Sequence, residues 1–173
     1  MPANWKSFCG NQLAVLLLIN KKGDKMESNA REILDFVIEQ EGKLNSILGK
    51  IDKKNLGKSL NKPIEDLQRI SLKNIKLLEK LNAELGEDIK NIKIANIIVD
   101  DFSIDDSKVD SFDKITALIF IMKTLDSSIE LFSKINKHTD EELLLRAFQG
   151  LISEKQRIKE KVSKIYDQSI MNS

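Results

Sequence analysis

The chain has 173 residues, which is long enough for one domain with a substantial apolar core. Hydrophobic residues make up 41% and charged residues 32%, with only two prolines, so the composition favours an all-helical protein and leaves little signal for strands. The 28 basic residues nearly equal the 27 acidic ones, so no net field favours nucleic acid or an anionic membrane as a partner.

Residues 1–28 precede the first clear helical pattern, and we treat them as an N-terminal extension that packs or frays. Their apolar run, 13–19, is too short to span a bilayer and is not followed by a small-x-small cleavage motif. Cys9 is the only cysteine, which excludes an intramolecular disulfide and any multi-cysteine metal site within one chain. This cysteine content is compatible with a reducing compartment, so we expect a cytoplasmic protein.

A first long helix is expected from residue 30 to residue 51, at the start of a domain that covers residues 29–169. Asn29 and Glu32 have the spacing of a capping box, which favours a helix start at this point. The apolar stripe that follows repeats at steps of three and four residues. One acidic residue, Glu41, interrupts the stripe near its middle.

A second helix is expected after a basic, polar connection. Pro63 suits the first turn of this helix, and Gly86 marks its end. Its stripe of Ile and Leu carries two polar residues, Ser71 and Asn74. The lysines within 43–62 have no interleaved aromatic residues, so we interpret them as a solvated edge and not as a nucleic-acid site.

Residues 87–109 lose the helical pattern and are expected to form a long connection. This connection holds an acidic cluster that lacks the glycine and the terminal glutamate of a calcium loop, so we expect it to be solvated. The cluster consists of Asp100, Asp101, Asp105 and Asp106. Asp110 is expected to cap a third helix, because aspartate is a favoured residue at helix starts.

Thr139 and Glu142 form a capping-box pattern for a fourth helix, about three residues after the third, so the two should be antiparallel neighbours. A shift of 84 residues carries the first stripe onto the third and the second onto the fourth, and places Phe36 on Phe120. The connection between the second and third helices is long enough to return along the bundle. Together these features predict a ferritin-like four-helix bundle, in which a long crossover joins two antiparallel helix pairs.

Several segments in the second half of the chain carry a family resemblance, and they are 117–120, 129–132, 138–142, 147–148 and 153–155. In pattern and spacing they resemble the third helix, tight turn and fourth helix of the rubrerythrin branch of the ferritin-like superfamily. The similarity extends over about residues 30–168. It implies a centre of two metal ions, held by one Glu from each of two helices and a Glu-x-x-His from each of the other two.

Most positions that correspond to those ligands hold other residue types; the six positions are Glu41, Ser71, Asn74, Leu125, Lys155 and Ile158. One carboxylate beside a lysine cannot balance two divalent cations, and Leu125 and Ile158 offer no lone pairs. The only histidine, His138, belongs to no Glu-x-x-His motif. We therefore expect no metal and no other cofactor, and the family's four-cysteine iron module is excluded.

A buried ion pair between Glu41 and Lys155 is one possible replacement for the metal centre, with Ser71 and Asn74 satisfying the remaining donors and acceptors. Leu125 and Ile158 would then fill space. In the alternative, Lys155 extends to solvent and Glu41 lies at the edge of the bundle. Tyr166 and Phe132 fall on or near the core stripes, and we interpret both as packing residues.

These observations favour a non-catalytic structural or interaction protein that self-associates, with an unidentified protein partner. Apolar residues off the main stripes support self-association, namely Ile70, Leu77, the segment 143–145 and the segment 13–19. The alternative is an iron or manganese oxidase or peroxidase with a shifted site, in which Glu41 is joined by one or more of Glu39, Asp126, Glu130 and Glu154. A third reading is an unrelated adaptor bundle, which a simple hairpin between the second and third helices would favour.

Overall fold

The computed structural model describes residues 28–51, 57–91, 93–94, 97, 102–104 and 112–172. The helices in these ranges are α2 (Ala30–Lys50), α4 (Lys58–Glu84), α5 (Glu87–Lys90), α6 (Lys114–His138) and α7 (Glu142–Met171). Strand pairing in the described ranges is confined to one isolated bridge between Asn29 and Lys93. The all-helical fold class is therefore confirmed. The apolar run 13–19 and Cys9 lie outside the described residues.

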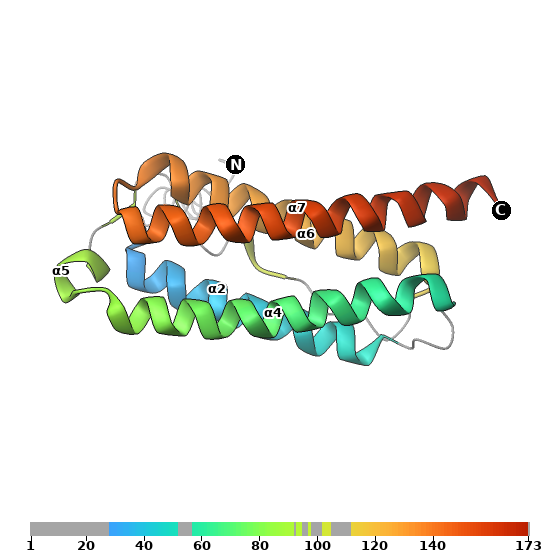
Figure 1. Ribbon diagram of the computed structural model, residues 1–173, viewed down its shortest axis with the longest axis horizontal. Coiled ribbons are helices and arrows are strands. Elements are labelled where there is room, and N and C mark those ends of the chain that lie inside the picture. Colours follow the sequence, from blue (N-terminus) through green and yellow to red (C-terminus); the bar gives the residue numbers. More distant parts are fainter. Residues whose placement is uncertain are drawn as a thin grey trace, which may run out of the picture.

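The long helices form two hairpins that lie side by side, α2 with α4 and α6 with α7 (Figure 1). Helix α4 of the first hairpin also packs against α7 of the second. Only residues 139–141 separate α6 from α7, so the prediction that these two helices are antiparallel neighbours is confirmed.

Helices α4 and α6 run in the same direction, so the chain between them returns along the bundle and does not form a hairpin (Figure 1). The described residues of this connection follow the same path. Ile94 and Ile97 are buried in an apolar cluster with the first turn of α2, whereas Ile104 and Phe112 pack on the cluster at the opposite end. An unrelated adaptor bundle, which a simple hairpin between the second and third long helices would have favoured, is therefore not favoured.

The start of α2 has the predicted capping box. Asn29 Oδ1 accepts a hydrogen bond from the backbone N of Glu32, and Glu32 Oε2 accepts one from the backbone N of Asn29, both at 2.9 Å. The start of α6 differs from the prediction, because Asp113 and not Asp110 is the N-cap. The sequence offers several aspartates in a row of polar residues, and only the backbone geometry decides which of them caps the helix.

The start of α7 also differs from the prediction. Thr139 lies at the end of α6, where its Oγ1 accepts a hydrogen bond from the backbone N of Glu141 at 3.2 Å. The N-cap of α7 is Glu141, so the predicted capping box of Thr139 and Glu142 is wrong. In a turn of three residues, a threonine can be the C-cap of one helix or the N-cap of the next, and here Thr139 is the C-cap of α6.

Helix α4 begins five residues earlier than the position of Pro63 suggests. Gly57, with a φ of 78°, adopts the left-handed conformation that lets the chain turn just before Lys58. Pro63 then lies inside the helix, where its missing N–H removes one backbone bond near the N-terminus. The four-residue helix α5, which follows α4 directly, was not predicted, because it is too short to show an apolar period.

We expect Asp113 to make stability depend on pH in the acid range. Hydrogen bonds from the backbone and side chain of Thr116 lower the pKa of the Asp113 carboxyl from its ordinary value of 3.8. A lowered folded-state pKa adds stability above the unfolded pKa, and this stability is lost as the pH falls through the folded pKa. Asp113→Asn should therefore retain the cap and show a smaller loss of melting temperature on acidification below about pH 5. Thermal melts of both proteins across this range test it, and identical slopes would contradict it.

Candidate functional site

A polar layer crosses the core of the bundle at the level of Glu41. It separates two apolar clusters, one that includes Leu44, Leu67 and Leu118 and one that includes Val37 and Phe148. The polar and charged residues buried in this layer are Glu41 on α2, Ser71 and Asn74 on α4, Thr124 on α6 and Lys155 on α7. Each of the four long helices therefore contributes a polar side chain at the same depth.

Glu41 and Lys155 meet in this layer as a buried ion pair. The distance from Lys155 Nζ to Glu41 Oε1 is 2.6 Å, and the two side chains are 0% and 4% exposed. The pair joins α2 to α7, which belong to different hairpins. The structure thus brings the two charges together. In the alternative, Glu41 would lie at the edge of the bundle and Lys155 would extend to solvent, and neither is observed.

The pair is well matched in charge but poorly matched in hydrogen bonding on the lysine side. No acceptor among the described residues lies in a hydrogen-bonding direction from Lys155 Nζ, although Glu41 Oε1 is close. The ring of Phe132, whose centroid is 5.8 Å from Nζ, supplies a cation–π contact. A buried ammonium with this little directional support gains mainly Coulomb energy, which offsets its desolvation only in part.

Ser71 completes the carboxylate side of the pair. Its Oγ lies 2.7 Å from Glu41 Oε2 and 2.7 Å from the backbone O of Glu41. A hydroxyl has one proton, so Ser71 donates to one of these two oxygens at a time. The carboxylate therefore has Lys155 at one oxygen and Ser71 at the other.

Asn74 connects the polar layer to the surface. With its amide oriented by its hydrogen-bond partners, Nδ2 lies 3.3 Å from the backbone O of Ile70 and 3.3 Å from Glu154 Oε2. The other carboxylate oxygen of Glu154 accepts a hydrogen bond from Lys73 Nζ at 2.7 Å. Asn74 thus donates to the backbone O of Ile70 and to Glu154, and it is not directed to Glu41.

The residues of the layer do not fit a pair of metal ions. An ammonium occupies the space beside Glu41 Oε1, and its positive charge repels a divalent cation at this point. Leu125 and Ile158, at two further positions of the family ligands, are buried in the apolar cluster and carry no donor atom. Their chemistry excludes the di-iron centre that the family resemblance implies.

The acids proposed for a shifted site are each paired with a lysine, and all are exposed except Glu154, which is partly buried. The four pairs are Glu39 with Lys43, Asp126 with Lys159, Glu130 with Lys134 and Glu154 with Lys73. No three His, Cys, Asp or Glu side chains converge within the described part of the chain. The structure therefore does not assemble the shifted site from these residues.

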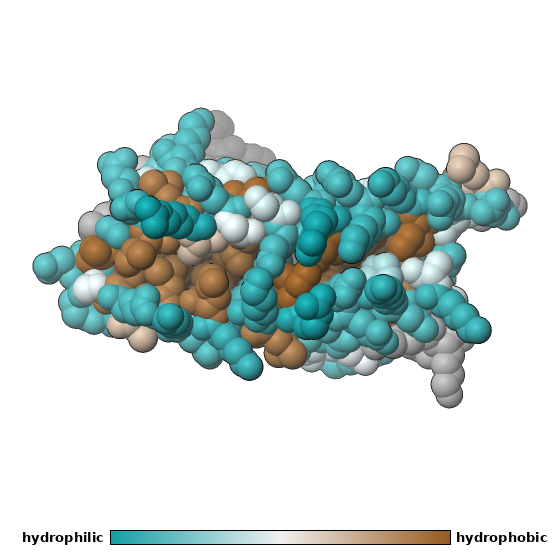
Figure 2. Space-filling view, in the orientation of Figure 1, coloured by the Kyte–Doolittle hydropathy of each residue, from teal (hydrophilic) through white to brown (hydrophobic). Residues whose placement is uncertain are grey.

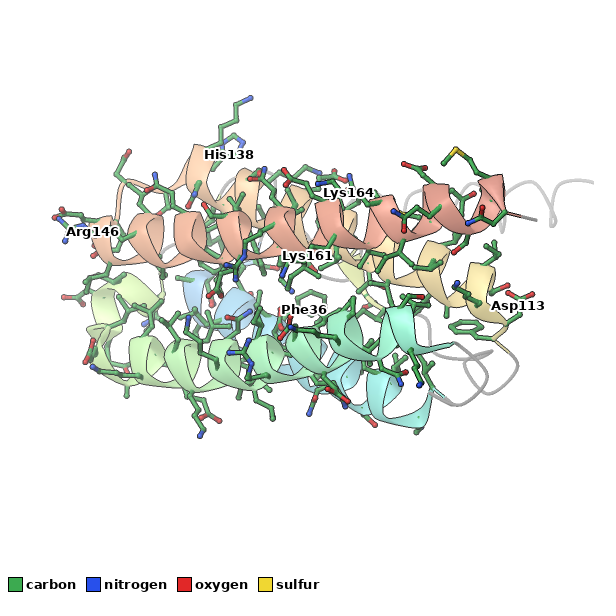
Figure 3. All side chains as sticks on the ribbon, turned by 45° about the vertical axis from the view of Figure 1, so that its right-hand side comes forward. Phe36, Asp113, His138, Arg146, Lys161 and Lys164 are labelled. Carbon is green, nitrogen blue, oxygen red and sulfur yellow. The ribbon has the colours of Figure 1, made fainter. Side chains whose placement is uncertain are left out.

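Other predicted residues have simpler positions. His138 is the last residue of α6 and points away from the core (Figure 3). Tyr166 packs at the edge of the apolar cluster that contains Leu44, and Phe132 is buried in the other. The acidic cluster at Asp100, Asp101, Asp105 and Asp106 lies outside the described residues.

A pocket of about 370 Å³ lies beside Glu41, between α2 and α6, and the sequence analysis missed it. Most of its wall is apolar, and five of the seven phenylalanines of the chain line it, namely Phe36, Phe102, Phe112, Phe120 and Phe132. Phe36, which lies near the middle of the molecule in Figure 3, comes from α2. Phe36 and Phe120 are 84 residues apart, so the internal repeat carried a signal that these two positions are equivalent.

We expect Ser71→Ala to lower the free energy of unfolding by about 1–3 kcal/mol, because it leaves a buried carboxylate oxygen of Glu41 without its donor. Ser153→Ala is the matched control, since Ser153 is an exposed serine whose Oγ donates only to the backbone O of Gln149. Urea unfolding measures both. Equal midpoints for the two variants would show that Ser71 does not support the ion pair.

Comparisons with protein-family models, with curated proteins and with solved structures found no match for this chain. In the described part of the chain, no helix combines the length and the apolar character needed to cross a membrane.

Proposed function

We propose that this protein is a non-catalytic, ferritin-like helical bundle that acts as a structural or interaction protein. The observation that carries the proposal is the Lys155 ammonium, 2.6 Å from the one carboxylate that remains of the family ligands. A fixed positive charge at this place substitutes for the cations of a metal centre. The layer then holds the two hairpins together and has no redox chemistry.

The ferritin-like part of the proposal is supported by the internal repeat. Helices α2 and α6 begin at Ala30 and Lys114, and α4 and α7 begin at Lys58 and Glu142, so both pairs are separated by 84 residues. The N-caps Asn29 and Asp113 have the same separation. With α4 and α6 parallel in Figure 1, this spacing agrees with two equivalent hairpins joined by a crossover.

Metal analysis tests the non-catalytic part. Protein purified without chelators and then incubated with Fe(II) or Mn(II) should contain far less than one metal ion per chain after desalting. Lys155→Met removes the resident ammonium but adds no carboxylate, so it should also remain metal-free. Near-stoichiometric iron or manganese in the wild-type protein would support the oxidase or peroxidase alternative and overturn the proposal.

Self-association is the form of interaction that the surface supports best. Apolar residues form a strip along the seam between α4 and α7, towards the α5 end (Figure 2). Leu77 on α4 and Leu143 on α7 are 42% and 46% exposed, and Ala147 on α7 is half-buried. Ile70 was also expected to support this interface, and that expectation is wrong, because Ile70 is 4% exposed and belongs to the core. Leu144 is buried as well.

We expect the wild-type chain to form dimers at micromolar concentration and Leu77→Lys to be monomeric, since a charge in an apolar interface is costly. Leu72→Lys is the control, because Leu72 is 49% exposed on the same helix but lies about 140° around the helix from Leu77. Sedimentation equilibrium reads out both. A monomeric wild-type protein, or equal behaviour of the two variants, would contradict an interface at this seam.

A further inference from the structure

The pocket between α2 and α6 has the size and the wall of a small-molecule site. Its volume of about 370 Å³ falls within the range of about 300–1,000 Å³ that is typical of ligand pockets. Val37 and Leu131 extend the wall of phenylalanine rings, and Phe112 and Phe120 lie against each other with ring centroids 5.2 Å apart. Such a wall favours an apolar molecule of modest size.

The residues 102–104 form one side of this pocket and are held to both helices. The backbone N of Ile104 donates a hydrogen bond to Gln40 Oε1 on α2 at 2.8 Å. The ring of Phe102 lies under the Lys134 ammonium of α6, which is 4.9 Å from the ring centroid. The pocket wall is therefore anchored at two points and is not a chance gap between the hairpins.

The polar groups at the pocket point to the charge of its ligand. Lys123 is an exposed residue of α6 that lines the pocket, so its ammonium is available at the mouth. No acidic side chain among the described residues lies within ion-pair distance of Lys123. The hydroxyl residues Thr124 and Ser127 follow it on the same wall and offer hydrogen-bond donors, whereas Ser128 Oγ already donates to the backbone O of Thr124.

Glu41 is the acid that lines the pocket among the described residues, and it does not favour a cationic ligand. Glu41 has Lys155 at Oε1 and Ser71 at Oε2, so its charge is already balanced inside the core. A ligand cation would gain nothing from a compensated carboxylate and would meet the positive charge of Lys123. Among the residues that the structure describes, the uncompensated charge at the mouth is therefore positive.

We propose that this pocket binds a monoanionic amphiphile, with its apolar body among the phenylalanines and its carboxylate at Lys123. The ligand class is a medium-length acyl carboxylate or an acid of similar shape. The apolar wall supplies affinity, and the lysine selects the sign of the head group. This binding role lies beyond the structural function proposed above and does not depend on the metal content or on the oligomeric state.

Three probes with the same body and different heads test the proposal, namely decanoate, decanol and decylamine. Calorimetric titration of the full chain should show one saturable decanoate site per chain, with decylamine bound at least about tenfold more weakly. Lys123→Glu should weaken decanoate binding by about tenfold or more, because like charges then face each other. Lys137→Glu is the matched control, an exposed lysine of α6 outside the pocket, and should bind decanoate as the wild type does.

A variant that fills the pocket provides an independent test of the proposal. Ser127→Trp places a large side chain into the pocket from α6 and should abolish binding of decanoate and decanol alike, with the helical circular dichroism unchanged. Three results would overturn the proposal. These are the absence of saturable decanoate binding, equal affinity for decanoate and decylamine, and unchanged decanoate affinity in Lys123→Glu.

Discussion

Replacing Lys155 with methionine is expected to lower the free energy of unfolding by about 3–5 kcal/mol, because the substitution leaves the buried Glu41 carboxylate without its counter-charge. The loss is a large fraction of the stability of an ordinary domain, which is about 5–15 kcal/mol. Urea unfolding followed by circular dichroism measures it. The size of the effect depends on the burial of both charges and not on the number of contacts.

The double variant Glu41→Met/Lys155→Met separates a buried pair from two independent residues. Because Lys155 Nζ has little directional hydrogen bonding, we expect the double variant to be at least as stable as the wild type. The coupling energy of the double-mutant cycle should then be several kcal/mol. Additive effects of the two single variants would show that the charges do not interact in solution.

Lys73→Met is the matched control for this cycle. Lys73 pairs with Glu154 at 2.7 Å, close to the Glu41–Lys155 distance, but its side chain is largely exposed. An exposed pair contributes about 0–1 kcal/mol, since water and salt screen the attraction. A loss in Lys73→Met as large as that in Lys155→Met would show that burial is not the cause.

Phe148→Ala should have an effect of similar size, with a loss of about 3–5 kcal/mol. Phe148 is fully buried on α7 and packs against Phe132, with ring centroids 5.2 Å apart. Removing the ring opens a cavity beneath Phe132, which also lines the pocket. Thermal and urea unfolding measure the loss.

Phe148→Leu and Phe36→Ala complete this series. Phe148→Leu retains most of the apolar volume and should cost clearly less than Phe148→Ala. Phe36 is only half-buried and faces the pocket, so Phe36→Ala should also be the milder substitution. A Phe36→Ala loss equal to that of Phe148→Ala would indicate that the pocket is packed shut in solution.

Local patterns predicted the helices better than their ends. The stripe around Glu41 and the pair Asn29 and Glu32 predicted α2 correctly, because a capping box and a helical period are set by residues close in sequence. The predicted start of α6, with Asp110 as the N-cap, was wrong, although the internal repeat indicates the correct residue. A shift of 84 residues carries Asn29 onto Asp113, which is the N-cap observed.

The sequence by itself determined the helical class, the main stripes and the interruption of those stripes by polar residues, since each depends on neighbours along one helix. It also set the chemistry of the centre, because no arrangement gives Leu125 or Ile158 a ligand atom. Only the tertiary structure decided that Lys155 turns to Glu41 and not to solvent, since a lysine on a helix can reach either. The phenylalanine pocket was likewise decided by packing, because its wall joins α2, α6 and residues 102–104, which are distant in sequence.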